Sequence, residues 1–299
     1  MKRATVVCCG QIVMDHSFSV DEIESPPSKV TARRYAAGVG GMSAHAAIAV
    51  ARLGGRSLFW GRVGDDAAGE TLAEAMAAEG VDIEGLHRFA GARTPLSAVI
   101  VDKRGERSIV TYRGDGLGLD TGWLPLDRLD GVGAVLCDPR WPAGTAAVFE
   151  AARARGIPSV LDAEKSEMRV LLDLVPLVDH AIFAAPGLRI FAGVKGAAEG
   201  LRKALASGPL KLAAVTRGED GTLWMEGGAD KPRETPAFRV SATNTTGAGD
   251  VFHGAYALAL AEGQAVAAAI RFASAAGALR ARDGETPDRA AVEAMLSAA

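Results

Sequence analysis

The second half of the chain alternates between short apolar runs and longer amphipathic segments, and this alternation limits the folds open to it. The runs are typical of strands and the segments of helices. The predicted strands cover 134–137, 159–162, 181–183 and 212–216, and the predicted helices cover 145–155, 168–175 and 196–207. Strands joined through helices make right-handed crossovers, so we expect an α/β protein with a mostly parallel sheet and helices on both faces.

The first half of the chain predicts a further strand and two segments that leave this sheet. The strand covers 4–9, and a helix rich in small residues is expected over 42–53. Residues 13–37 are interpreted as an excursion of short strands, and residues 97–112 as a β-hairpin. No linker rich in Pro, Gly or Ser divides the chain. We therefore expect a single domain over 1–299 with a small β-sheet lid built from these two segments.

The composition excludes several classes of function. The formal net charge is −3 and aromatic residues make up 5% of the chain, so neither the basic surface nor the stacking platforms of a nucleic-acid-binding protein are expected. The 3 cysteines include no CxxC pair, which argues against a disulfide framework or a zinc site. No apolar run approaches the ~18 residues of a membrane span, and no signal-peptide core is present. These features predict a cytoplasmic protein without nucleic-acid or membrane partners.

The segment at 244–250, Asn-Thr-Thr-Gly-Ala-Gly-Asp, carries the clearest chemistry in the sequence, and it leads into a predicted helix over 251–262. Glycines let a ligand approach the backbone, and the first N–H groups of a helix have no partner within the helix. With the helix dipole they form an anion site suited to a transferred phosphoryl group. Asp250 is expected in the first turn, where a carboxylate can accept the proton of an attacking hydroxyl.

Three motifs resemble those of the ribokinase-like (PfkB) carbohydrate kinases. TNTTGAGDVFHGA at 243–255 resembles the second family signature, and the segment 40–66, with its Gly-Gly pair and GRVGDD end, resembles the first. VTRGEDG at 215–221 resembles the nucleotide-binding turn. The resemblance covers nearly the whole chain and implies a three-layer α/β/α domain, a mostly parallel central sheet and a small β-sheet lid.

The resemblance also implies an activity: an ATP-dependent kinase that uses Mg²⁺ and transfers the γ-phosphoryl group to a sugar hydroxyl. By position, Asp250 would be the catalytic base, and Gly247, Ala248 and Gly249 would form the anion hole. The other matched positions would bind the two substrates. For the sugar they are Asp15, at the end of the first strand, with Gly40 and Gly41, and for the nucleotide they are Thr216, Gly218 and Gly221.

Within the family, the sequence is similar to the bacterial kinases of 6-deoxy-6-sulfofructose, through VMD at 13–15 and LCDPRW at 136–141 among other segments. Those enzymes hold the sulfonate with a Lys, an Asn and an Arg. Lys29 and Arg140 match the Lys and the Arg, and Thr111 stands in place of the Asn. A fixed anion needs cationic donors, and Arg offers a fork to two oxygens. The resemblance therefore predicts phosphorylation of the 1-hydroxyl of sulfofructose.

Several points depart from the family pattern or stay open. The family's Asn-x-x-Glu motif, linked to metal and phosphate handling, has no match after Phe183, so the metal ligands are unknown, with Asp162 and Glu164 as candidates. Met42 and His45 stand where Asn is common, and His45 fits a sugar contact or a packing residue equally well. A monovalent cation such as K⁺ is a further cofactor left open. The family often pairs its lids, so a homodimer through the lid is expected.

Other functions fit parts of the sequence. A kinase for fructose or another ketose, or for a sugar bearing phosphate or carboxylate, would keep the same catalytic residues. A sugar sensor without turnover would have no need of Asp250. A Rossmann dehydrogenase would need G-x-G-x-x-G and a helix after Gly10, and both are missing.

Overall fold

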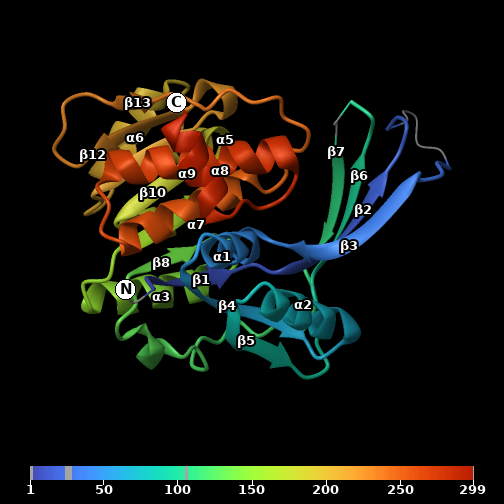
Figure 1. Ribbon diagram of the computed structural model, residues 1–299. Coiled ribbons are helices and arrows are strands. Elements are labelled where there is room, and N and C mark those ends of the chain that lie inside the picture. Colours follow the sequence, from blue (N-terminus) through green and yellow to red (C-terminus); the bar gives the residue numbers. More distant parts are fainter. Residues whose placement is uncertain (1–2, 24–28, 105–106, 299) are drawn as a thin grey trace.

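The computed structural model describes residues 3–23, 29–104 and 107–298. Within these residues one large sheet of nine strands runs through the molecule (Figure 1). In spatial order the strands are β13 (Arg233–Thr235), β12 (Thr222–Glu226), β11 (Leu212–Thr216), β10 (His180–Ala184), β9 (Ser159–Ala163), β8 (Ala134–Cys137), β1 (Thr5–Gly10), β4 (Arg56–Gly64) and β5 (Asp82–Phe89). The strands from β11 to β5 are parallel, and β12 pairs in the antiparallel sense with both β11 and β13. The expected α/β fold is confirmed.

Helices cover both faces of this sheet. Side chains of a strand alternate between faces, so Val6 and Cys8 of β1 enter one buried cluster, and Val7 and Cys9 enter the other. The first cluster is covered by α1 (Met42–Arg52), α2 (Ala67–Ala78), α7 (Ala248–Ala261), α8 (Val266–Asp283) and α9 (Arg289–Ser297), and the second by α3 (Pro142–Ala154), α4 (Met168–Leu174), α5 (Ala185–Ala192) and α6 (Ala197–Ala206). No helix among the described residues is long and apolar enough to cross a membrane.

The contact between α1 and α7 depends on small residues. Ala44, Ala46 and Ala47 of α1 are buried, and a Cβ atom at Gly254 of α7 would lie 2.4 Å from the Ala46 carbonyl oxygen. Only glycine permits that approach of two helix backbones. The first turns of both helices consequently reach the carboxyl ends of the parallel strands, where Ser43 contacts Asp138 and His253 contacts Asp162.

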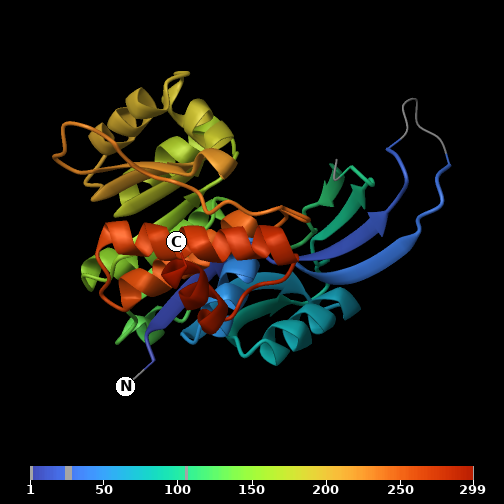
Figure 2. The ribbon, with the colours of Figure 1, turned by 45° about the horizontal axis from the view of Figure 1, so that its top comes forward.

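A second, four-stranded sheet projects from the body of the molecule (Figure 2). Its order is β3 (Arg34–Gly40), β2 (Val13–Ser19), β6 (Leu96–Val101) and β7 (Arg107–Tyr112). β2 pairs with β3 and β6 with β7 in the antiparallel sense, whereas β2 and β6 are parallel. Parts of the two predicted lid segments, residues 24–28 and 105–106, lie outside the described residues. We refer to this sheet as the lid sheet.

Some elements differ from the sequence expectation. The pattern did not predict β5, the antiparallel pair β12 and β13, or helix α5, which begins directly after β10 with Pro186 in its first turn. Proline fits there because the first N–H groups of a helix have no partner within it. At the start of α2, Asp66 is the helix cap, and its Oδ1 accepts from Gly69 N at 2.9 Å.

Asp138, directly after β8, joins three segments through its buried carboxylate. Its Oδ2 accepts hydrogen bonds from the backbone N–H of Gln11 at 2.7 Å and of Ser43 at 3.2 Å, and from Ser43 Oγ at 2.6 Å. Its Oδ1 accepts from the Arg140 N–H at 2.8 Å. A Cβ atom at Gly10 would lie 2.3 Å from Asp138 Oδ2, so glycine is required there.

Replacing Asp138 by alanine is expected to lower the free energy of unfolding by about 3 kcal/mol, because several buried donors lose their acceptor. Urea denaturation followed by circular dichroism measures the change. Asp130→Ala is the matched control, because Asp130 is exposed and, among the described residues, its ion pair is with Arg155 at the surface, so little change is expected. Equal losses in the two variants would contradict the anchoring role of Asp138.

Candidate active site

The loop at 244–250 and the first turn of α7 form an open anion site. Gly247 is the residue before the helix, with a φ of 76°, a conformation that favours glycine. A Cβ atom at Gly249 would meet nothing within 4 Å, so space lies in front of the first turn. The loop is braced by Asn244, whose Oδ1 accepts from Thr246 N at 3.0 Å. A helix start with free space before it can receive a phosphate-like anion.

Asp250 lies in this first turn, partly exposed, within a group of interacting acidic residues. Burial raises the pKa of the Asp250 carboxyl well above its usual range, and the neighbouring Asp162 raises it further. Asp162 is itself buried. Its pKa is raised mainly by this burial and further by the negative charge of Glu164. A carboxylate with a raised pKa accepts a proton more readily than an exposed one, as a general base must.

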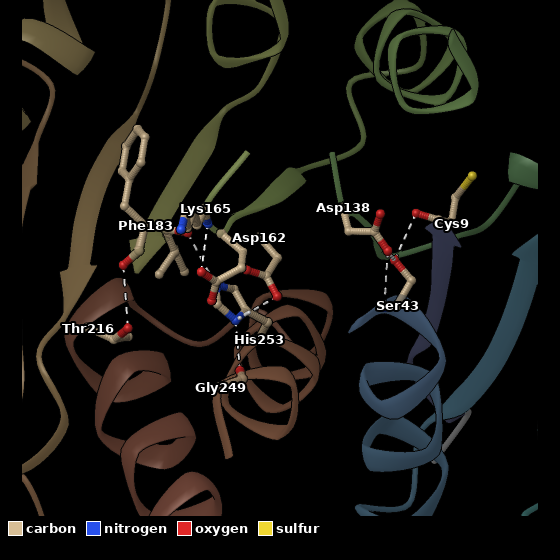
Figure 3. A network of polar contacts seen from close by, with 11 residues as sticks. Cys9, Ser43, Asp138, Asp162, Lys165, Phe183, Thr216, Gly249 and His253 are labelled. Carbon is tan, nitrogen blue, oxygen red and sulfur yellow. Dashed lines mark hydrogen bonds and ion pairs between the residues drawn. The ribbon is translucent and has the colours of Figure 1, made fainter. Parts of the chain in front are cut away.

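His253 connects Asp162 to the first turn of α7 (Figure 3). Its Nδ1 lies 2.7 Å from the Gly249 carbonyl oxygen and 3.3 Å from Asp162 Oδ2, and its Nε2 lies 3.3 Å from the Ile182 carbonyl oxygen in β10. Burial lowers the pKa of His253, and its hydrogen bonds to the backbone act in the opposite direction by raising it. The sequence reasoning missed this histidine. The signal was its position three residues after Asp250, because residues three apart in a helix are neighbours on its surface.

A cleft of about 510 Å³ opens at the carboxyl ends of β10 and β11. Thr216 and Gly218 line it together with Lys195, Arg189 and Arg217, and its size lies within the range of small-molecule sites. The Thr216 hydroxyl donates to the Phe183 carbonyl oxygen at 3.4 Å. The cationic side chains and the helix start of α5 suit an anionic ligand such as a nucleotide.

Gly221, the third residue predicted to contact a nucleotide, does not line this cleft. It is buried, with a φ of 75°, and a Cβ atom there would lie 2.2 Å from the Thr235 carbonyl oxygen. The geometry gives Gly221 a role in the turn that precedes β12.

Three residues of the lid sheet lie in one row across its strands. Asp15 of β2 pairs in register with Ser97 of β6, which pairs with Thr111 of β7. Ser97 donates a hydrogen bond to the Asp15 carboxyl, which burial nevertheless holds at a raised pKa. The hydroxyls of Ser97 and Thr111 lie 3.4 Å apart. Asp15 therefore lies within the lid sheet, in the segment that the sequence predicted to form short strands. It does not lie at the end of the first strand, where it was expected.

The two glycines predicted to face the sugar are both required by close contacts. A Cβ atom at Gly40 would lie 2.2 Å from Asp15 Oδ2. A Cβ atom at Gly41 would lie 2.5 Å from the Gln11 carbonyl oxygen, and Gly41 has a φ of 103°. His45, one turn into α1, is largely buried, and burial lowers its pKa to about 4. A neutral, buried imidazole fits the packing interpretation of His45.

Arg140 lines a small cleft of about 60 Å³ beside the end of β1, together with Arg62 and Arg113. The Arg62 guanidinium lies 4.4 Å from the ring centre of Trp141, and its Nη1 donates to the Gly118 carbonyl oxygen at 2.8 Å. The sequence reasoning missed Arg62 and Arg113, which come from β4 and from the segment after β7. Lys29, which was expected beside Arg140, is exposed in the connection between β2 and β3 and does not line the cleft.

The described residues contain no group of three or more side chains that would hold a metal ion on their own. Asp162 and Glu164 nevertheless lie close enough to Asp250 to affect its pKa. Mg²⁺ in phosphoryl-transfer sites is usually held by one or two carboxylates together with the substrate phosphates and water. These two carboxylates fit that pattern.

Comparisons with known proteins agree with this geometry. The family described as pfkB family carbohydrate kinase matches residues 3–289. The ribokinase of Bacillus subtilis is 30% identical over 96% of this chain and 98% of its own, and fructokinase-1 of Zea mays is 28% identical over 93% and 91%. A solved structure from Agrobacterium tumefaciens, of a protein taken to be a ribokinase, superposes with a TM-score of 0.92 at 34% identity, covering 99% of this chain and 98% of the other.

The raised pKa of Asp250 predicts a pH-dependent effect on stability. A carboxyl whose pKa is raised by folding stabilises the fold while it is protonated, and this contribution is lost as pH rises through the raised pKa. Asp250→Asn stays neutral, so the variant is expected to be more stable than the parent at about pH 8 and similar to it near pH 3.5. Thermal unfolding at the two pH values measures this. Exposed Asp230→Asn controls for the amide itself. A variant less stable at pH 8 would contradict the assignment.

Proposed function

The chain belongs to the pfkB family of carbohydrate kinases, and from this premise we propose that it phosphorylates the 1-hydroxyl of 6-deoxy-6-sulfofructose with ATP. That it is an ATP-dependent sugar kinase follows from the family and the fold. The observation that carries the catalytic assignment is Asp250, a carboxyl of raised pKa in the first turn of a helix with open space before it.

In the proposed reaction, Asp250 takes the proton of the sugar hydroxyl as the oxygen attacks the γ-phosphorus. The new O–P bond forms while the bond between the γ-phosphorus and the bridging oxygen breaks, and ADP leaves with that oxygen. The backbone at Gly247, Ala248 and Gly249 faces the phosphoryl oxygens, whose charge the helix dipole stabilises. Thr216 and Gly218, which line the larger cleft, contact the nucleotide.

Bound Mg²⁺ neutralises phosphate charge in such reactions. Asp162 and Glu164 are the residues proposed to hold it together with the nucleotide, because they stand beside Asp250 in the same acidic group. Their mutual repulsion, which raises the pKa of Asp162, is relieved when a cation binds.

The anionic sugar is supported by the three arginines of the small cleft. Arg62, Arg113 and Arg140 line it, and none of them has a carboxylate ion pair among the described residues. In the lid sheet, Asp15 would bind sugar hydroxyls, and Thr111, in place of the Asn, would donate a hydrogen bond to the anion. Exposed Lys29 would have to approach the sugar from the connection between β2 and β3.

A neutral sugar is the second candidate. The relatives named above are a ribokinase and a fructokinase, so the aldose ribose, or fructose or another ketose, fits the family as well. A phosphate- or carboxylate-bearing sugar would use the same arginines as a sulfonate.

A homodimer through the lid sheet is also proposed. Its strands carry exposed large side chains, with Tyr35, Ile109, Val110 and Tyr112 each at least 45% exposed. β3 and β7 form its two edges, and a second copy of the same sheet would cover both the apolar side chains and the unpaired edge groups.

The 3 buried cysteines are free, which agrees with the proposed cytoplasmic location.

The substrate is identified by ADP release from ATP and Mg²⁺ with sulfofructose, fructose, ribose and fructose 6-phosphate at matched concentrations, in KCl and in NaCl. The largest kcat/KM is expected for sulfofructose, and Asp250→Asn is expected to lower kcat by about 10³-fold while ATP binding persists. A preference for another sugar rejects sulfofructose and keeps the kinase. Absence of turnover with every sugar favours a sensor.

The Arg140→Met variant distinguishes the proposal of an anionic sugar substrate from that of a neutral one. The variant is expected to lower kcat/KM for sulfofructose roughly 10- to 100-fold, because a charge-assisted hydrogen bond is lost, and to change fructose turnover little. The backbone bond from Arg140 N to Asp138 stays intact, so the fold is retained. Arg239→Met, at an exposed position, is the control. Equal losses for both sugars would exclude an anion contact at Arg140.

A further inference from the structure

Arg280 is a buried cation that the sequence motifs do not explain. It lies in the last turn of α8, and the residue is only 9% exposed. Its Nη1 is fully buried and has no hydrogen-bond partner among the described residues. Arg282, two residues later, shows the ordinary alternative: it is exposed and pairs with Asp283.

The guanidinium of Arg280 faces the loop before α7. A Cβ atom at Gly247 would lie 3.5 Å from both Nε and Nη2 of Arg280. Burial lowers the pKa of Arg280, and the negative charge of Asp250 opposes that shift, so the two side chains interact. Arg280 therefore lies directly against the residue that begins the proposed anion hole.

A second arginine reaches the same loop from the lid sheet. Arg107 of β7 donates from Nη2 to Thr245 Oγ1 at 2.5 Å. Arg107 and Arg280 repel each other, since Arg107 contributes to the lowered pKa of Arg280. Two guanidinium groups thus converge on a segment of seven residues whose only carboxylate is Asp250.

A buried guanidinium without a hydrogen-bonded anion is costly, because neither water nor a counter-charge replaces its lost hydration. A bound anionic ligand would supply the missing partner. Open space lies beside Gly249, two residues after the Gly247 that Arg280 faces.

We propose that Arg280 is a built-in cation of the phosphoryl-binding loop, whose charge stabilises an oxyanion bound at Gly247–Gly249 from the α8 side of the loop. The inference rests on the proposed kinase function and deepens it, because the transferred phosphoryl group is the anion that this site receives. Arg280 acts through the loop and through Asp250, and it is a positioning residue for the reaction.

Thermal unfolding with and without inorganic phosphate tests the site without any sugar. Phosphate is expected to raise the Tm of the parent protein and of the control Arg282→Met, but not that of Arg280→Met. Without phosphate, Arg280→Met is expected to unfold at or above the parent Tm, because it removes an unpaired buried charge while keeping an apolar stem. An arginine with a purely structural role would instead lower the Tm, and phosphate would stabilise parent and variant alike. That result would overturn the proposal.

Turnover provides the second measurement, on whichever sugar the parent protein phosphorylates. Arg280→Met is expected to lower kcat by about 10²-fold, with little change in the KM for the sugar and with partial recovery on adding guanidinium ion at millimolar concentration. Arg280→Lys, which keeps the charge, should retain more activity than Arg280→Met, and it carries both measurements should the methionine variant not fold. A kcat within about threefold of the parent for Arg280→Met overturns the proposal.

The two proposals fail separately. Loss of phosphate stabilisation in Arg280→Met, in a protein that phosphorylates no sugar, supports the anion site and rejects the kinase proposal. An active kinase whose Arg280→Met variant binds phosphate and turns over normally rejects the anion site alone.

Discussion

A single buried carboxylate, that of Asp138, holds together the three segments from which the candidate site is built. It accepts hydrogen bonds from Gln11 after β1, from Arg140 after β8 and from Ser43 at the start of α1, the last of which is drawn in Figure 3. Ser43 also donates to the Cys9 carbonyl oxygen at 2.9 Å. All of these donors are buried or half-buried, so an alternative arrangement would leave them unpaired. The cost would be a large fraction of the protein's net free energy of unfolding. The start of α1 is therefore held in one place.

The position of α1 determines that of the glycine loop. α7 packs on α1 through the contact between Gly254 and Ala46, so the loop before α7 lies at the carboxyl edge of the parallel strands. His253 attaches the other side of α7 to Asp162 and to the Ile182 carbonyl oxygen. These contacts set the direction of the first N–H groups of α7 in the absence of a ligand, and preorganised dipoles of this kind are the largest contribution to many transfer reactions.

Charge is distributed unevenly around this loop. Burial and the neighbouring Asp162 raise the pKa of Asp250 on the side of β9, whereas Arg280 and Arg107 approach from α8 and from the lid sheet. In a region of low dielectric these charges act strongly on each other and on a ligand. The lid sheet contributes at two places, with Asp15 and Thr111 along its strands and Arg107 at the start of β7. It thereby connects the proposed sugar side of the site to the phosphoryl side.

Local pattern in the sequence determined the class of fold and the place of the anion loop. The alternation after residue 127 predicted the mostly parallel sheet, because periodicity and β-branching act over a few residues. The glycines before α7 and the acid that follows them predicted a helix start with a carboxylate in its first turn. Tertiary structure alone decided the partners of these groups. Arg280 is separated from Gly247 by the whole of α7, a turn and most of α8, and Arg62 lies in β4 whereas Arg140 follows β8. Their proximity arises from how helices and strands pack, which depends on the summed burial of many side chains and leaves no short-range signal in the sequence.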